Sequence, residues 1–443
     1  MASNKHLRRV IVRLLGSMGT PKEVQQYLKR FSDLDGLKFA VVKVGGAIIE
    51  NQLGDLASSL TFLQQVGLTP IVIHGGGPQL TRALSEQNIE THKRDGFRVT
   101  SPDALKVARR VFQTENLRLT AALREAGSDA TSITGGVFEA RLLDKERYGM
   151  VGEVTDVDIE PVRAVTGSGH IPVISPLAET ADGQILNING DVAANALVEA
   201  VQPFKIIFLT GTGGILDAQD KIISSINLST DFERLMQQDW LHSGMRLKLQ
   251  QIQQLLSQLP RESSVSITRP ELLPRELFTH RGSGTLVRLG EDLHALADWS
   301  DVDTARLSTL LESSFGKTLK PDYFRRTALK IAYVSDSYRA AAIICAGPNG
   351  IARLDKFAVT EAAQGEGIGS ALWHRVRKAH GAMYWRARPG NAINTFYFRH
   401  ADGFVRTDEW LVFWYGIEQM NVVQTLIDDA CALEATMLSE SEA

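Results

Sequence analysis

The first feature that could do chemistry is a lysine beside two glycine-rich turns. Each turn follows an apolar run with strand character, VVKV in one case and IVIH in the other. Glycine lets the backbone approach an anion closely, and the N–H groups that open a following helix can bind phosphate oxygens. Two such turns in one unit favour a phosphate site over ordinary tight turns. The residues of this pattern are Lys43, Gly45, Gly46, Gly75, Gly76 and Gly77.

Further charged residues at expected strand ends and helix starts suggest phosphoryl transfer. That reaction needs positive charge and positioning, with little covalent chemistry. Lys43 and Lys248 could clamp the moving phosphoryl group, and Asp191 could keep both lysines charged and oriented. Arg98 could bind a substrate carboxylate in bidentate fashion. For any one residue alone the simpler interpretation is a solvated lysine, or a helix N-cap at Asp191.

A second glycine-rich loop, of another kind, occurs late in the chain within AVTEAAQGEGIGSALW. It lies between an expected strand and an expected helix, where free N–H groups suit a pyrophosphate. Such a loop alone is weak evidence, and its position among antiparallel strands argues against a dinucleotide-binding fold. Its residues are Gln364, Gly365, Gly367 and Gly369.

Three cations in the same part of the chain favour an acceptor molecule with two carboxylates, such as glutamate. Arg386 and Arg388 lie two residues apart in YWRARPGN and so share one face of an expected strand. Lys356, in LDKF, adds a third positive charge. The alternative is that the two arginines are solvated charges on an edge strand.

These residues require a scaffold of two domains. Strand and helix patterns alternate over residues 37–289, which predicts an α/β domain with a doubly wound, mostly parallel sheet. Ligands of such sheets bind at the carboxyl ends of the strands. Residues 290–436 predict an α+β domain with antiparallel strands, of which the first is expected near Ala328. Short helices are expected within residues 1–36.

Length and composition narrow the class of protein. A chain of 443 residues is too long for one core, and 44% hydrophobic with 22% charged residues is ordinary for a globular protein. The net charge of −3 predicts neither nucleic acid nor an anionic membrane as a partner. Two cysteines form neither a disulfide framework nor a metal cluster, so a reducing cytoplasm is the expected setting. No apolar run is long enough to span a bilayer.

The basic, amphipathic N-terminus lacks a signal-peptide core. A docking or oligomerising helix is expected there, with a mitochondrial transit peptide as the alternative.

Seven motifs, in order, resemble those of N-acetylglutamate kinases, which are members of the amino acid kinase family: KVGG, HGGG, GFRVT, IPVISPL, NINGD, GMRLK and ELFTHRGSGT. The resemblance implies that Lys43 and Lys248 stabilise the transition state and that Asp191 organises them. It implies that N-acetylglutamate is held by Gly76, Gly77, Arg98 and Asn187. It implies that the ATP phosphates, with Mg²⁺ but no protein metal ligand, are held by Lys43, Gly45, Gly46 and Gly75.

The QGEGIG loop resembles the Q/R-x-x-G-x-G/A loop with which GNAT acetyltransferases bind the coenzyme A pyrophosphate. The segments LDKF, YWRARPGN and NTFYFRHADGF are similar to the acetyltransferase domain of vertebrate-like N-acetylglutamate synthases. This similarity implies that Tyr397 protonates the leaving thiolate. It implies that glutamate is held by Lys356, Arg386, Arg388 and Asn391. No general base is identifiable, which leaves that role to water.

As a whole, the chain resembles the bifunctional N-acetylglutamate synthase/kinases of bacterial arginine biosynthesis. Such an enzyme acetylates L-glutamate with acetyl-CoA and phosphorylates the N-acetyl-L-glutamate with ATP. The alternative is a synthase whose kinase-like domain only binds arginine as a regulator. One departure from the kinase pattern is Gly211 in LTGTGG, where the family usually has an acidic residue. This departure puts the strength of ATP binding in doubt more than the phosphoryl-transfer chemistry.

Arginine-sensitive kinases of this family bind arginine between an N-terminal helix and the segment equivalent to ELFTHRGSGT. Carried over by position, this implies that Glu276 and Gly282 hold L-arginine as an inhibitor. The alternative is a solvated Glu276 at a strand end. The expected N-terminal helices and the long helix expected over residues 105–123 are candidate subunit contacts of a homo-oligomer, by resemblance a tetramer.

Overall fold

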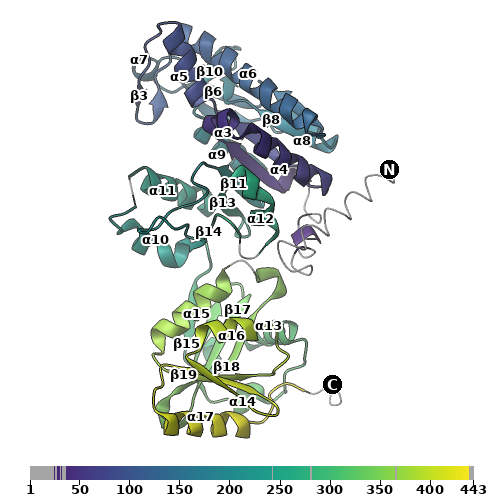
Figure 1. Cartoon of the computed structure of the whole chain (residues 1–443), viewed down its shortest axis with the longest axis vertical. Coiled ribbons are helices and arrows are strands. Elements are labelled where there is room, and N and C mark those ends of the chain that lie inside the picture. Colours follow the sequence, from purple (N-terminus) through teal and green to yellow (C-terminus); the bar gives the residue numbers. More distant parts are fainter. Residues whose placement is uncertain are drawn as a thin grey trace. The chain divides into compact units, whose positions relative to one another are not determined.

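The computed structural model describes residues 24, 27–29, 31, 36–241, 243–279, 282–364 and 367–438. The helices expected before residue 36 therefore lie mostly outside the described residues. The chain forms two compact units, one up to Leu289 and one from Gly290 onward (Figure 1). No helix among the described residues combines the length and apolar character that crossing a membrane would need.

The first unit is built on an eight-stranded sheet. All its neighbouring strands are parallel except β13 and β14, so the expected mostly parallel sheet is confirmed. The central strands are almost fully buried, as strands with helices on both faces must be. In spatial order they are β12 (Ser225–Asn227), β14 (Thr285–Arg288), β13 (Ser264–Thr268), β11 (Lys205–Leu209), β1 (Ala40–Val44), β2 (Ile71–His74), β8 (Ile171–Ile174) and β5 (Ala130–Ile133).

Helices cover both faces of this sheet, which makes it doubly wound (Figure 1). Neighbouring residues of β1 belong to different cores: Val41 packs in one cluster with Leu197, and Val42 in another with Leu60. The helices on the face of Val42 include α4 (Leu53–Gln65), α6 (Pro102–Glu125) and α12 (Leu273–Phe278). Those on the face of Val41 include α8 (Glu160–Gly167), α9 (Gly190–Val201), α10 (Leu228–Met236) and α11 (Ser243–Ser257). The long helix expected over residues 105–123 is thus present as α6.

Two smaller sheets complete the first unit, and both carry predicted site residues. The hairpin of β3 (Lys93–Arg94) and β4 (Phe97–Arg98) pairs Lys93 with Arg98. A four-stranded sheet, which the sequence did not predict, contains Asn187 at the end of its edge strand. Its order is β10 (Ile185–Asn187), β9 (Leu177–Glu179), β6 (Phe138–Leu142) and β7 (Gly152–Val157). The short helices α3 (Gly46–Asn51), α5 (Gly77–Glu86) and α7 (Lys145–Tyr148) complete the named elements around it.

The second unit is built on a seven-stranded sheet with one parallel pair. That pair, β18 and β19, is hydrogen-bonded only from Ala352 to Leu354, although both strands continue. Beyond Leu354 the two strands are no longer paired with each other. In spatial order they are β15 (Leu293–Leu296), β16 (Leu329–Ser335), β17 (Ala340–Ala346), β18 (Ala352–Val359), β19 (Met383–Ala387), β21 (Leu411–Tyr415) and β20 (Gly403–Arg406).

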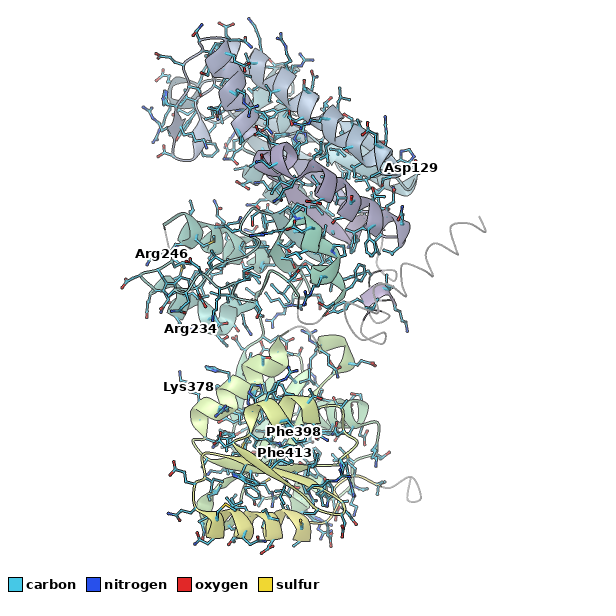
Figure 2. All side chains as sticks on the ribbon, viewed as in Figure 1. Asp129, Arg234, Arg246, Lys378, Phe398 and Phe413 are labelled. Atoms are coloured by element: carbon cyan, nitrogen blue, oxygen red, sulfur yellow. The ribbon has the colours of Figure 1, made fainter. Side chains whose placement is uncertain are left out.

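Helices again cover both faces. Helices α15 (Ile368–Ala379) and α16 (Asn394–His400) share a core with Trp385, whereas α17 (Met420–Ala432) packs on the other face against Tyr384. Helices α13 (Thr304–Phe315) and α14 (Tyr323–Arg326) pack with Ile343 in a further cluster. The aromatic core extends to the edge of the sheet, where the rings of Phe398 and Phe413 lie 5.2 Å apart (Figure 2).

The expectation of no strand before Ala328 is wrong, because β15 pairs antiparallel with β16. Its four residues, LHAL, are half-buried or exposed at an edge of the sheet. Such an edge strand needs no apolar run, and its pairing depends on a partner 40 residues away in the chain.

Candidate active sites

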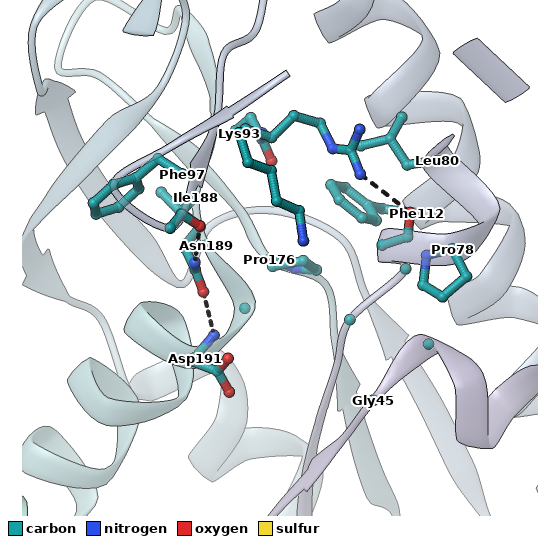
Figure 3. Close-up of a pocket in the computed structure, with 18 of the residues that line it drawn as sticks. Gly45, Pro78, Leu80, Lys93, Phe97, Phe112, Pro176, Ile188, Asn189 and Asp191 are labelled. Carbon is teal, nitrogen blue, oxygen red and sulfur yellow. Dashed lines mark hydrogen bonds between the residues drawn. The ribbon is translucent and has the colours of Figure 1, made fainter. Parts of the chain in front are cut away.

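In the first unit the predicted phosphate and carboxylate residues surround one cavity of about 270 Å³ at the carboxyl ends of β1 and β2 (Figure 3). The predicted residues that line it are Lys43, Gly45, Gly46, Gly75, Gly76, Gly77, Arg98, Asn187 and Asp191. The sequence therefore located the cavity, although the residues come from six separate elements or turns. Their roles remain predictions.

The two glycine turns touch each other at the floor of this cavity. A Cβ atom on Gly46 would lie 2.6 Å from Gln79 Oε1 and 3.1 Å from Gly76 Cα, so only glycine fits there. The amide of Gln79 also donates to the carbonyl of Gly46 at 2.8 Å. Helix α5 begins after Gly76 with no side-chain cap. Pro78 has no N–H group, and the N–H of Leu80 is bonded to Gly76, so the groups left for an anion at this helix start are those of Gly77 and Gln79.

Lys43 is oriented by a short ion pair: its Nζ lies 2.6 Å from Asp191 Oδ1. Asp191 stands in the first turn of α9, but it is not the N-cap. That role belongs to Asn189, whose Oδ1 accepts the N–H of Asp191 at 2.8 Å. The N-cap interpretation of Asp191 is thus wrong, and its carboxylate is available to hold the lysine.

Lys248 approaches this pair from α11 without lining the cavity. Its Nζ lies 5.1 Å from the centre of the Phe208 ring. Burial lowers the pKa of Lys248, the positive charge of Lys43 lowers it further, and Asp191 opposes both effects. Lys248 is thus within electrostatic reach of Lys43 and Asp191, whereas the ion pair itself joins Lys43 and Asp191.

Arg98 reaches the cavity from the β3–β4 hairpin. One terminal nitrogen donates to Thr81 Oγ1 at 2.7 Å, and the other to Thr91 Oγ1 at 3.3 Å. These contacts fix the guanidinium but use only part of its five N–H groups, which leaves donors for a substrate carboxylate. Lys93, which pairs with Arg98 across the hairpin, also lines the cavity (Figure 3). Lys93 was not among the predicted site residues, although the hairpin KRDGFR pairs it with Arg98.

The glycine loop of the second unit joins β18 to α15. Gly367 is the N-cap of α15, adopts a left-handed φ of 81°, and leaves the helix start without a side-chain cap. A Cβ on Gly369 would lie 3.3 Å from Val359, so the helix passes close to the strand. Gln364 ends the preceding turn, and Gly365 lies outside the described residues. The geometry suits a pyrophosphate at the helix N-terminus.

Tyr397 lies on α16 among aromatic rings, 5.4 Å from Trp385 and 5.5 Å from Phe413 between ring centres. Its hydroxyl makes no hydrogen bond to any residue that the structure describes. Burial raises the pKa of Tyr397 far above its usual value. The phenol therefore stays protonated at neutral pH and can serve as a proton donor.

Lys356 is buried and already paired. Its Nζ lies 2.7 Å from both Asp355 Oδ2 and Thr436 Oγ1. Burial would raise the pKa of Asp355, but Lys356, the Tyr323 hydroxyl and Arg353 together lower it. The register shift between β17 and β18 leaves Asp355 as the extra residue of a bulge beside Lys356. Binding of glutamate by Lys356 would require this ammonium to exchange partners.

Arg386 and Arg388 differ in their surroundings. Arg386 donates to the carbonyls of Ala430, Leu433 and Glu434 near the end of α17, at 2.7–2.9 Å. Arg388 is half-exposed and donates to Glu409 Oε2 at 3.0 Å.

Asn391 lies in the loop that leads into α16, where its Oδ1 accepts the N–H of Ile393 at 3.2 Å. Its amide NH₂ makes no hydrogen bond to a described residue, so the donors implied for glutamate remain available.

The residues expected to bind arginine adjoin each other. Glu276 is buried, and its Oε2 accepts the N–H groups of Ser283 at 2.7 Å and Gly284 at 2.9 Å. The interpretation of Glu276 as a solvated charge is therefore wrong. Gly282 has φ of 58°, and a Cβ there would lie 2.7 Å from Glu276 Oε2. The loop folds directly over the carboxylate.

Two known domain families cover the two units. Residues 38–259 match the amino acid kinase family, and residues 294–432 match the N-acetyltransferase of N-acetylglutamate synthase. The first unit thus contains an amino acid kinase domain, and the second an N-acetyltransferase domain. The chain belongs to the acetylglutamate kinases of the amino acid kinase family, in the form that carries this second domain.

Several relatives match along nearly the whole chain. An acetylglutamate kinase of Xanthomonas campestris pv. campestris is 54% identical over 95% of this chain and 100% of its own length. One from Xylella fastidiosa is 54% identical over 93% of this chain and 97% of its own. The mitochondrial N-acetylglutamate synthase of Homo sapiens is 31% identical over 94% of this chain and 76% of its own.

Among solved structures, N-acetylglutamate synthase from Neisseria gonorrhoeae, complexed with coenzyme A and N-acetyl-glutamate, is similar with a TM-score of 0.62. It is 19% identical and covers 90% of this chain and 98% of its own, so it supports the fold alone. The resemblance, the fold class and the expectation of a two-domain transferase are confirmed.

The lowered pKa of Lys248 predicts a pH dependence. Since the ammonium loses its proton at a lower pH than an ordinary lysine, kinase activity should fall as the pH rises toward the usual lysine value of about 10.4. The measurement is kcat/KM for phosphorylation against pH. Lys248→Arg keeps the charge and should shift the alkaline limb upward, whereas the exposed control Lys145→Arg should not. Identical limbs in all three proteins would contradict the assignment.

Proposed function

We propose that this chain is a bifunctional enzyme of arginine biosynthesis. Its second unit acetylates L-glutamate with acetyl-CoA, and its first unit phosphorylates the resulting N-acetyl-L-glutamate with ATP. The two matched families and relatives named acetylglutamate kinase and N-acetylglutamate synthase support both activities. The single observation that carries the kinase half is the ion pair of Lys43 and Asp191 in a cavity that also contains Arg98 and Asn187.

Phosphorylation of a carboxylate needs no general base, because the nucleophile is already ionised at neutral pH. A side-chain carboxylate oxygen attacks the γ-phosphorus of ATP, the bond to the β-phosphate oxygen breaks, and ADP leaves. Lys43 and Lys248 stabilise the charge on the moving phosphoryl group, and Asp191 keeps them oriented. Arg98 and Asn187 hold the remaining polar groups of the substrate.

The glycine turns fit the nucleotide phosphates, because both line the cavity beside Lys43 and the helices that follow them begin without a side-chain cap. Mg²⁺ would neutralise phosphate charge. The described residues contain no group of three or more His, Cys, Asp or Glu side chains that could hold a metal ion.

Acetyl transfer moves the acetyl group from sulfur to nitrogen. The neutral amine of glutamate attacks the thioester carbonyl, its nitrogen loses a proton to water, and the C–S bond breaks. The thiolate of coenzyme A takes a proton from Tyr397, which regains one from solvent. The uncapped start of α15 holds the pyrophosphate of coenzyme A, with Gln364, Gly367 and Gly369. Lys356, Arg386, Arg388 and Asn391 bind the glutamate. Gly365 is assigned to the loop by its position in the motif.

A second candidate function is that of a synthase whose first unit binds arginine without turnover. The observation that favours it is Gly211, which follows β11 where kinases of this family usually carry an acidic residue. Release of ADP that depends on N-acetyl-L-glutamate would exclude this alternative. Release of free coenzyme A thiol with L-glutamate tests the acetyltransferase that both functions share.

The two activities should be separable by mutation. Lys43→Ala removes charge that matters most in the transition state, so the rate of N-acetylglutamate-dependent ADP release should fall by roughly 10²–10³-fold. Acetyl transfer by the same preparation should persist, because its residues lie in the other compact unit, and it serves as the control for folding. Full kinase activity in Lys43→Ala would remove this lysine from the clamp.

Tyr397→Phe keeps the buried ring and removes only the proton donor. The rate of acetyl transfer should fall by roughly 10²-fold, within the range for general acid catalysis. Kinase activity of the same protein should not change. The readout is coenzyme A thiol release under saturating substrates. Turnover equal to that of the wild type would show that another group, or water, protonates the thiolate.

We further propose that L-arginine inhibits the enzyme at Glu276 and Gly282, that the chain forms a homo-oligomer, by resemblance a tetramer, and that it acts in the cytoplasm. The free thiols of Cys345 and Cys431 suit a reducing compartment. Helix α6 exposes Leu117 and is a candidate subunit contact. Inhibition of a remote activity requires arginine to bind one conformational or assembly state better than another.

The arginine site can be tested without unfolding its loop. Glu276→Gln keeps an oxygen that can accept the N–H groups of Ser283 and Gly284, but it removes the negative charge that would pair with arginine. Half-inhibition of both activities should therefore need about tenfold more arginine or more, since hydrogen bonds to charged groups are the stronger ones. Both activities are titrated with arginine in each protein. An unshifted titration would place the site elsewhere.

A further inference from the structure

One indole ring is shared by the two arginines of the presumed acceptor site. The guanidinium carbon of Arg386 and that of Arg388 each lie 3.9 Å from the centre of the Trp410 ring. Both distances are well within the range of a cation–π interaction, for which tryptophan is the strongest partner. Residues two apart on a strand point to the same side about 6.6–7 Å apart, a spacing that one aromatic ring can fill.

The ring is held in place before any ligand binds. Trp410 is half-buried and lies in the turn that joins β20 to β21. Its carbonyl accepts the N–H of Thr407 at 2.8 Å, and its own N–H donates to Thr407 Oγ1 at 3.1 Å. The indole also packs against the cluster formed by Tyr384, Val412 and Leu426. Trp410 is therefore a fixed surface for the guanidinium groups to lie against.

The two guanidinium groups are not equally available to a ligand. Arg386 already donates to three backbone carbonyls near the end of α17, so it anchors that end of the helix. Arg388 has one charged partner, Glu409, and both side chains of this pair are more than half exposed. An exposed ion pair contributes little free energy, so a substrate carboxylate can replace Glu409.

The backbone of Arg388 is tied to the helix that carries Tyr397. The carbonyl of Arg388 accepts the side-chain N–H of Asn394 at 2.9 Å and the backbone N–H of Asn391 at 3.0 Å. Asn394 is buried and is the first residue of α16. The Arg388 main chain is thus fixed relative to Tyr397, while the far end of its side chain is restrained by the Trp410 ring and by the exposed ion pair with Glu409.

We propose that Trp410 is a positioning residue of the acetyl-acceptor site. It holds the Arg388 guanidinium in the orientation that receives one carboxylate of the acceptor, and Arg386 fixes the ring through the same stacking. This inference rests on the proposed acetylation of glutamate. In this proposal the two arginines have different roles. Arg388 binds the carboxylate, and Arg386 holds the Trp410 ring in place by stacking on it.

The test compares Trp410→Leu with Trp410→Phe in the full chain. The leucine variant should raise the KM for glutamate by about tenfold, because the guanidinium loses its platform. Its KM for acetyl-CoA and its kcat at saturating glutamate should stay within about threefold, and Trp410→Phe should keep most of the affinity for glutamate. The kinase activity of each protein and its thermal unfolding report on folding. If the leucine variant folds poorly, Trp410→Met replaces it as a larger apolar side chain without a π-face.

A matched control is Glu409→Gln, which removes the carboxylate that competes for Arg388 and should not raise the KM for glutamate. An unchanged KM for glutamate in folded Trp410→Leu or Trp410→Met would overturn the role of Trp410. So would an equal rise in the KM for glutamate and for acetyl-CoA, which a merely structural defect would produce. Failure of the wild type to acetylate glutamate would instead overturn the proposed function.

Discussion

The ion pair of Lys43 and Asp191 is the interaction around which the first cavity is arranged. Lys43 comes from a buried strand, and Lys248 from a helix on one face of the sheet. Burial disfavours the charged form of Lys248, and the charge of Lys43 disfavours it further. Asp191, 2.6 Å from Lys43, opposes both effects. Asn189 caps the helix whose first turn presents this aspartate. The two glycine turns line the cavity beside Lys43, where the substrate would bind.

The sequence predicted those parts of the molecule whose signals are local. The glycines that follow two apolar runs predicted both turns of the first cavity. Close approach of two backbone segments requires glycine, and glycine is visible in the sequence. The spacing of Arg386 and Arg388 likewise predicted that they share one face, and both guanidinium groups lie over the ring of Trp410. In each case the residues are close together in the chain, so the periodicity of a strand or helix predicts which of them lie on the same side.

Features that depend on distant partners were not predictable. The buried state of Lys356 is set by Asp355 and by Thr436, 80 residues further along the chain. The sequence contains no sign that Glu276 accepts the N–H groups of the loop that follows it, since its helix could equally have faced solvent. The same holds for β15 and the four-stranded sheet with Asn187, whose strands are short and only partly buried. Such strands form because they pair with neighbouring strands, more than because of the intrinsic β-propensity of their residues.

The charges of the first cavity also explain why acetylation would come first. Its titratable lining residues are Lys43, Lys93, Arg98 and Asp191, and the aspartate is already engaged by Lys43. A free ammonium group on glutamate would enter this positive cavity without a counter-ion, which is unfavourable in a partly desolvated site. An N-acetyl group removes that charge and keeps both carboxylates for the cations. It also prevents the amine from attacking its own activated carboxyl group, so the electrostatics and the chemistry impose the same order.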